Sequence, residues 1–151
     1  MSESKFFIIK HDLASLEALP NYIWRTGKSE AEVPKKFNEI KAGARWVAFA
    51  YRKSDEDKQP LSQITGFFEC TEEAHYGDIP PEGKTVAHGE VKAWLIKGKP
   101  YGDQPQGPVS VRSIDQLLGR KHFKGQAIVP ISDKEFEQIR KETLSRGVRE
   151  K

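Results

Sequence analysis

The residue types that most often carry catalysis are few in this chain and lie far apart. The four histidines are His11, His75, His88 and His122, and none has a second histidine or a cysteine at the spacing of a metal site. Cys70 is the only cysteine, and the alternation of its segment predicts a buried structural thiol rather than a nucleophile. We therefore expect no catalytic residue, no metal site and no cofactor.

The glycine-rich segments do not predict a phosphate-binding loop. Residues 98–102, Gly-Lys-Pro-Tyr-Gly, lack the spacing of a P-loop. Gly27-Lys28-Ser29 ends like one, but it lacks the upstream glycine and a preceding strand. A nucleotide-hydrolysing enzyme is therefore not indicated.

Trp24 is the best candidate for a binding residue. It lies in a polar segment, residues 22–28, in which core packing does not require an indole. Next to Arg25, Thr26 and Lys28, an indole could stack on a nucleic-acid base. The alternative is that Trp24 folds under its own loop as part of a small satellite core. The other two tryptophans, at positions 46 and 94, fall in predicted strands, which favours a core position for both.

The composition is typical of a single soluble domain. Of the 151 residues, 36% are hydrophobic and 31% are charged, and 25 Lys and Arg against 22 Asp and Glu give a formal net charge of +3. A chain of this length can bury one core. No apolar stretch is long enough for a membrane span, and no signal sequence opens the chain. We therefore expect a cytoplasmic protein without a membrane partner.

Charge is unevenly distributed along the chain. Acidic residues crowd positions 55–82, whereas lysines and arginines gather on both sides of that block, at 35–53 and 112–124. Folding could bring the basic segments onto one face suited to nucleic acid. Two ordinary solvated faces are an equal alternative.

The predicted elements begin with a strand at 6–9, a short helix at 13–19, an irregular stretch at 21–34 and a short helix at 35–41. Alternation in the strand predicted at 44–52 gives one core face and one face with space for a helix or a ligand. The core face consists of Val47, Phe49 and Tyr51, and the other face consists of Trp46, Ala48 and Ala50.

Further strands are predicted at 63–71, 86–97 and 126–131, with an irregular acidic stretch after the first and a loop at 98–108. A short helix is predicted at 114–118, capped by Ser113. Ser132 and Glu135 have the spacing of a capping box, which opens a helix that ends at about Ser145. Because strands and helices do not alternate regularly, we predict an α+β fold, a small mixed β-barrel of about five to six strands with flanking short helices and a C-terminal helix. Residues 1–151 form one domain, with about 146–151 as a tail or linker.

Short motifs along nearly the whole chain resemble those of YTH and EVE domains. Residues 6–10, Phe-Phe-Ile-Ile-Lys, and 23–26, Ile-Trp-Arg-Thr, resemble the start of a YTH domain, and 66–69, Gly-Phe-Phe-Glu, and 90–97 resemble two of its later strands. Residues 40–46, Ile-Lys-Ala-Gly-Ala-Arg-Trp, and 130–136, Pro-Ile-Ser-Asp-Lys-Glu-Phe, are similar to EVE motifs. Both families belong to the PUA-like superfamily of small β-barrels.

This resemblance implies a reader of modified bases. YTH domains hold a methylated adenine in a pocket walled by aromatic rings, and EVE domains have modified cytosines among their ligands. A module of this kind would recognise N6-methyladenine or 5-methylcytosine in an aromatic cage, and it would flip the base out of duplex DNA.

The resemblance also assigns residues to a base pocket with two aromatic walls and a polar rim. Trp24 matches the first wall, and Tyr76 or His75 stands in for the tryptophan that forms the second wall in YTH domains. The rim, whose peptide groups and polar side chains would meet the base edge, consists of Lys10, His11, Asp12, Arg25 and Thr26. The phosphates would be contacted by Lys28, Arg45, Arg120, Lys121 and Lys124.

Several roles remain open for such a module. It would fit as the specificity domain of a modification-dependent restriction system, with a fused or associated nuclease or NTPase module. A PUA-like RNA-binding module without modified-base selectivity is one alternative, and there Trp24 would serve packing only. A protein-interaction domain that uses the 98–108 loop is another.

Overall fold

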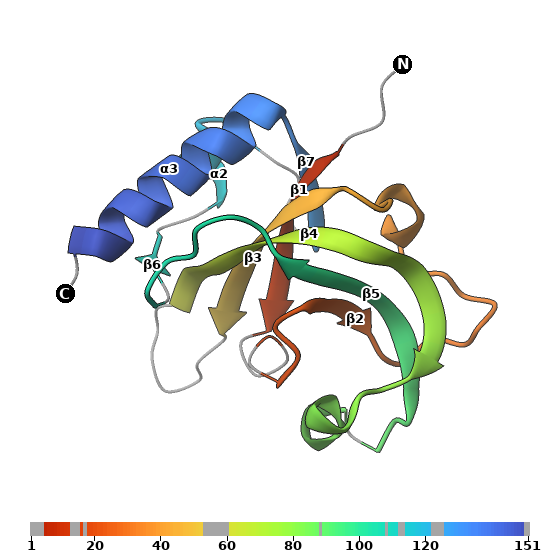
Figure 1. Cartoon of the computed structure of the whole chain (residues 1–151). Helices are drawn as coiled ribbons and strands as arrows, with labels where there is room; N and C mark the ends of the chain where they lie inside the picture. The colour runs from red at the N-terminus through yellow and green to blue at the C-terminus, as the bar shows by residue number, and fades with distance from the viewer. Residues whose placement is uncertain are drawn as a thin grey trace.

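One mixed sheet of seven strands forms most of the structure (Figure 1). The computed structural model describes residues 5–12, 16, 18–52, 61–87, 89–107, 109–111, 114–121 and 126–149. The strands are β1 Phe6–Asp12, β2 Tyr22–Arg25, β3 Arg45–Arg52, β4 Leu61–Asp78, β5 Lys92–Pro100, β6 Val109–Ser110 and β7 Ile128–Ile131. Their order is β2-β5-β4-β3-β1-β7, with β6 paired to β4. The strand β1 pairs in parallel with β3 and antiparallel with β7.

The strand count exceeds the predicted five to six, because two short strands have weak sequence signals. One is β6, and the other is β2, which occupies part of the stretch predicted to be irregular. Four and two residues are too few to show a hydrophobic period. The strand β2 is defined by its pairing with β5, and β6 by its pairing with β4.

The helical segments are η1 Phe37–Glu39, η2 Pro81–Val86, α2 Ile114–Leu118 and α3 Asp133–Arg149. The helix predicted at 114–118 is confirmed, although its proposed cap, Ser113, lies outside the described residues. The C-terminal helix is also confirmed and extends past its predicted end. The helix predicted at 13–19 lies mostly outside the described residues; Leu16 and Ala18 in it are helical. No helix in the described ranges is long and apolar enough to cross a membrane.

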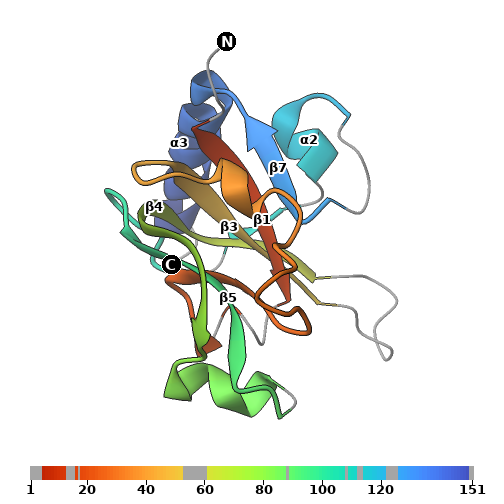
Figure 2. The same cartoon turned by 90° about the vertical axis from the view of Figure 1, so that its right-hand side faces the viewer.

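Both faces of the central strand β3 are buried because the sheet curls (Figures 1 and 2). Val47 and Phe49 pack on the helix side with Phe136 and Ile139 of α3. Trp46 belongs to a cluster to which both edge strands of the sheet, β2 and β7, contribute. The prediction that a helix packs on the Trp46 face is confirmed in part, because the helical residues Leu16 and Phe37 join this cluster. The long helix α3 lies on the Val47 face instead, and strands of the same sheet complete the enclosure of Trp46.

The strand β4 is longer than predicted. The expectation of an irregular stretch after Thr71 is wrong, because β4 continues to Asp78. Its register with β5 shifts between Cys70 and Glu72 and again between Glu72 and His75. Such bulges break the two-residue alternation that marks a strand in sequence, and they bend the strand. The strand predicted at 86–97 is confirmed over residues 92–97, but its predicted start is too early, since β5 begins at Lys92 and Val86 ends η2.

Cys70 is a buried thiol, as predicted. It is 3% exposed and lies in the same cluster as Trp46. Burial is the largest cause that raises the pKa of this thiol, to about 11, and the neighbouring Glu73 adds to the effect. A thiol with this pKa is protonated at neutral pH, and only the thiolate is a strong nucleophile.

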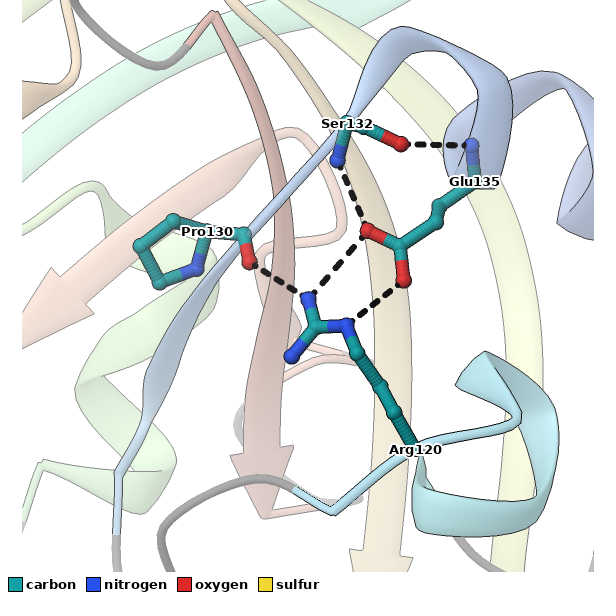
Figure 3. Close-up of polar contacts among 4 residues, drawn as sticks. All are labelled: Arg120, Pro130, Ser132 and Glu135. Carbon is teal, nitrogen blue, oxygen red and sulfur yellow. Dashed lines mark hydrogen bonds and ion pairs between the residues drawn. The ribbon is translucent and has the colours of Figure 1, made fainter.

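A network of polar contacts fixes the start of α3 (Figure 3). Oγ of Ser132 accepts a hydrogen bond from the N–H of Glu135 at 3.0 Å, and Oε1 of Glu135 accepts one from the N–H of Ser132 at 2.9 Å. The predicted capping box is thereby confirmed. Arg120 donates to both carboxylate oxygens of Glu135, at 2.8 and 3.2 Å, and this contact is the main cause that lowers the pKa of Glu135.

The side chain of Gln104 completes the edge of β4 between β5 and β6. The N–H of Phe67 donates to Oε1 of Gln104 at 2.9 Å, and Nε2 of Gln104 donates to the carbonyls of Phe67 at 2.9 Å and Tyr101 at 3.0 Å. A Cβ at Gly66 would lie 2.7 Å from Oε1 of Gln104, so the glycine makes room for this contact. The amide thus replaces a neighbouring strand at this one position.

His11 is a buried polar side chain inside the curl. On β1 its side chain points to the same face as Phe7 and Ile9, which belong to the Trp46 cluster, and it is 7% exposed. Its Nε2 has no hydrogen-bond partner among the described residues. Burial lowers the pKa of His11 from 6.5 to about 4, so the imidazole is neutral at physiological pH.

We expect Gln104→Ala to lower the free energy of unfolding by roughly 1–3 kcal/mol, because it leaves the buried N–H of Phe67 without an acceptor. Urea denaturation at neutral pH measures this change. Gln106→Ala is the matched control, since Gln106 is an exposed glutamine two residues away. Its effect should stay within about 0.5 kcal/mol. Equal losses in the two variants would contradict the role given to Gln104.

The burial of His11 predicts a pH dependence of stability. In the unfolded chain this histidine is protonated below its ordinary pKa of 6.5, whereas in the native state it is protonated only below about pH 4. Stability present above pH 6.5 is therefore lost as the pH falls toward 4, by on the order of 3 kcal/mol. The variant His11→Leu should lack this part of the decline in urea denaturation across that range. Parallel profiles for the two proteins would rule out a neutral buried imidazole.

Candidate nucleic-acid interface

Two rows of side chains cross the β2–β5–β4 end of the sheet, one on each face. Trp24 pairs with Leu95, which pairs with His75, so these three side chains share one face. We call this the Trp24 face. Arg25 pairs with Trp94, which pairs with Tyr76, and this second row points to the opposite face, inside the curl.

On the Trp24 face, the indole is partly buried. It packs against a satellite cluster that includes Leu19, Ile79 and Leu95. Its Nε1 is buried and has no hydrogen-bond partner among the described residues. The part of the ring that remains exposed offers an apolar surface, while the unpaired N–H leaves one donor unused. The packing of Trp24 on this cluster supports a structural role, and its unpaired N–H supports a role in recognition.

His75 is exposed on the same face. Its Nδ1 lies 3.2 Å from the carbonyl oxygen of Glu73, and its ring leans over Gly77, where an added Cβ would lie 3.5 Å from Cδ2. Leu95, between His75 and Trp24, is 2% exposed. The face therefore carries two rings with an aliphatic side chain between them.

Tyr76 belongs to the inner row instead. Its ring centroid lies 5.9 Å from that of Trp94, and both rings pack in the central cluster. Trp94 donates from Nε1 to the carbonyl of Ser29 at 2.9 Å, which ties the segment after β2 to this ring. The structure thus brings His75, and not Tyr76, to the face of Trp24. The predicted core position of Trp94 is confirmed.

The predicted rim residues are divided between faces. Lys10 and His11 are neighbours on β1, so their side chains point to opposite sides. Partial burial lowers the pKa of Lys10, and the nearby carboxylate of Asp115 in α2 opposes this shift, which puts Lys10 on the helix side. His11 faces the interior, and Arg25 is exposed on the inner row. Thr26 follows it, half-buried, and the side chain of Asp12 lies outside those described.

The predicted phosphate contacts do not gather around Trp24. Arg45 lies on the helix side of β3, opposite Glu69, which is six residues before His75 and hence roughly 20 Å from it along β4. Arg120 is held by Glu135. Lys121 is exposed beyond α2, and Lys124 lies outside the described residues. Of this group, Lys28 is the residue nearest in the chain to Trp24, and it is half-buried.

Sequence reasoning missed Leu95 as part of this surface. Alternation in its segment identifies a buried side chain, but only the pairing of β2 and β5 puts it beside Trp24. The described residues contain no group of three or more histidine, cysteine or carboxylate side chains that could hold a metal ion. The arrangement can bind through ring surfaces and hydrogen bonds.

Comparison with known proteins identifies the fold. No protein-family model and no curated protein matches the chain. Among solved structures, the N-terminal domain of McrB from Staphylothermus marinus is similar with a TM-score of 0.55 and 14% identity, over 93% of this chain and 95% of that one. The ZmASCH protein of Zymomonas mobilis, solved as a mutant, is similar with a TM-score of 0.51 and 12% identity, over 95% and 99%.

A third structure, human THYN1 in complex with DNA containing 5-methylcytosine, has 16% identity over 98% of this chain and 99% of that one. Its TM-score of 0.47 is too low to bear on function. The first two likenesses show that this chain shares the fold of those structures. Its mixed sheet and C-terminal helix confirm the α+β class predicted from the sequence.

Proposed function

We propose that this chain is a non-catalytic nucleic-acid-binding module that recognises a methylated base on its Trp24 face. The observation that carries the proposal is the row of Trp24, Leu95 and His75 across three paired strands. It combines a partly exposed indole, an aliphatic floor and a second ring. The buried, unpaired Nε1 of Trp24 adds a donor that a ligand could satisfy after a small movement of the ring.

The spacing of this row suits a flat ligand. Trp24 and His75 are two strands apart, roughly 10 Å between backbones. Two rings that stack on both faces of a base need about 7–8 Å between their planes, since atoms in contact lie about 3.5–4.0 Å apart. Side chains that lean toward each other from these strands cover that difference. A base between them would contact both rings, while Leu95 lies beneath, covered by its own cluster.

A methyl group adds little area, so its recognition depends on an apolar, water-free surface. The Trp24 face supports this, because Leu95, Ala93 and Ile79 form its apolar base. Both N6-methyladenine and 5-methylcytosine fit this chemistry. A base in a duplex must first be flipped out at a cost of a few kcal/mol, and stacking on aromatic side chains offsets about 1–3 kcal/mol of it per base.

A specificity domain of a modification-dependent restriction system is the context we propose for this activity. Such a module needs a fused or associated nuclease or NTPase to act on the DNA. A second candidate function is a PUA-like RNA-binding module without base selectivity. The packing of Trp24 against Leu19 and Ile79 favours that alternative, because it gives the indole a purely structural task.

Fluorescence anisotropy with a panel of oligonucleotides tests the proposal. One sequence is prepared as single-stranded DNA, duplex DNA and RNA, each unmodified, with N6-methyladenine or with 5-methylcytosine, at one fixed salt concentration. We expect about tenfold or greater preference for one modified strand. Equal, salt-sensitive binding to all strands would instead support the RNA-type module, and absence of binding would overturn both.

Trp24→Ala should weaken binding to the preferred modified strand roughly 5- to 150-fold, which corresponds to a stacking contribution of about 1–3 kcal/mol. The measurement is the same anisotropy titration, with circular dichroism to verify folding. Trp24→Phe controls for packing, because it keeps an aromatic ring but removes the indole N–H. A folded Trp24→Ala protein with unchanged selectivity would remove Trp24 from the site.

The two candidates for the second wall give opposite predictions. His75→Ala should weaken binding to the modified strand about tenfold, because it removes a ring from the Trp24 face. Tyr76→Phe is the control and should bind as the unmodified protein does, because Tyr76 faces the interior and keeps its packing on Trp94. If Tyr76→Phe loses selectivity and His75→Ala does not, the base binds on the inner face.

A further inference from the structure

Two arginines share one aromatic ring on the helix side of the sheet, at the other end of β4 from the Trp24 row. The Cζ atom of Arg45 lies 4.0 Å from the ring centroid of Tyr101, and that of Arg140 lies 5.2 Å from it. The two residues come from β3 and α3. Both guanidinium groups are measured to the same point, so their separation cannot exceed the sum of these distances. The two positive charges therefore lie at most about 9 Å apart, on either side of or beside the same ring.

Hydrogen bonds to backbone carbonyls hold the loop that carries Tyr101 and Gly102 beneath these arginines. The N–H of Tyr101 donates to the carbonyl of Phe67 at 2.9 Å, and Nε2 of Gln104 donates to the carbonyls of Tyr101 at 3.0 Å and Gly102 at 3.4 Å. Gly102 has a φ of 65°, and a Cβ there would collide with the guanidinium of Arg140. The loop thus presents a ring and a bare stretch of backbone to the two side chains.

Among the described residues, one weak ion pair reaches this pair of arginines. Nη1 of Arg140 lies 3.9 Å from a carboxylate oxygen of Glu137, whose own side chain is half exposed, so solvent screens this contact. Glu69 lies opposite Arg45 across the β3–β4 pairing, but no ion pair joins them within 4.0 Å. Lys99 pairs in register with Glu69 and adds a further positive charge to this face.

The guanidinium groups also retain unused donors. Stacking on a ring engages the faces of a guanidinium and leaves its N–H groups, which lie in the plane, free for an anion. The Nε atoms of Arg45 and Arg140 are both buried without a hydrogen-bond partner among the described residues. Buried donors in native proteins are nearly always satisfied, so a pair of them in one place indicates a missing partner.

We propose that Arg45 and Arg140, on the bed of Tyr101 and Gly102, form a binding site for a phosphate group. A phosphate accepts several charge-assisted hydrogen bonds at once and matches the planar N–H fork of arginine. The site lies on the same face of the sheet as the Trp24 row, roughly 20 Å from His75 along β4. The proposal goes beyond the proposed function and does not depend on it. The phosphate could belong to a nucleic-acid backbone or to a free phosphoanion.

Isothermal titration of the full chain with inorganic pyrophosphate tests the site directly. We expect saturable binding that Arg45→Met and Arg140→Met each weaken about tenfold or more, since methionine keeps the packing of the stem and removes the fork. Lys141→Met is the matched control, because Lys141 is exposed on α3 next to Arg140 and carries the same charge. It should alter the affinity by less than about twofold.

The second arm of the experiment distinguishes the two sources of phosphate. Binding to an unmodified duplex oligonucleotide is measured against salt concentration. A backbone contact predicts that each methionine variant lowers the slope of log K against log salt by about 1, whereas a free phosphoanion predicts an unchanged slope with lost pyrophosphate binding.

Circular dichroism verifies that each variant folds, and Arg140→Lys is the second variant at that position. It keeps the charge and loses the planar fork, so it should also weaken pyrophosphate binding. The proposal is overturned if the unsubstituted chain does not bind pyrophosphate and folded arginine variants leave the salt slope unchanged. It is equally overturned if the arginine variants bind pyrophosphate as Lys141→Met does.

Discussion

The enclosure of Trp46 by its own sheet is the constraint on which the rest of the molecule depends. Its ring stacks on Phe68 at 5.7 Å between centroids and is almost fully buried. A Cβ at Gly98 of β5 would collide with the indole, so β5 can approach only because this residue is glycine. The curl that follows brings β2 and β7, the two ends of the strand order, onto one core. The positions of the side chains near Trp24 and Tyr101 depend on this curl of the sheet around Trp46.

Strong local signals predicted much of the fold. The capping box of Ser132 and Glu135 and the two α-helices 114–118 and 133 onward depend on contacts within a few residues, which the sequence records directly. The burial of Cys70 was predicted from the alternation of its strand, although its partners in the core are distant in the chain. The bulges of β4 and the short strand β2 depend on partners far along the chain. Alternation fails at bulges, and four residues carry too little pattern, so these two features needed the structure.

The candidate site was predicted in its residue types more than in its geometry. Trp24 and His75 were both named from sequence, yet which second ring shares the face with Trp24 depends on the register of β4 against β5. A shift of one residue exchanges His75 and Tyr76 between faces. The basic residues were chosen by charge alone, and charge does not say that Arg120 is already held by Glu135 or that Arg45 lies on Tyr101. Long-range pairing settles such questions, and no local pattern encodes it.

Gln104 makes the molecule dependent on the chemical lifetime of one amide. Its Nε2 donates to three carbonyl oxygens, those of Phe67, Tyr101 and Gly102. Deamidation would put a carboxylate oxygen, which only accepts hydrogen bonds, against those three acceptors. The edge of β4 and the loop that carries the ring beneath Arg45 and Arg140 would lose their anchor together. Slow hydrolysis in an ageing sample would therefore loosen this corner while the core around Trp46 stayed packed.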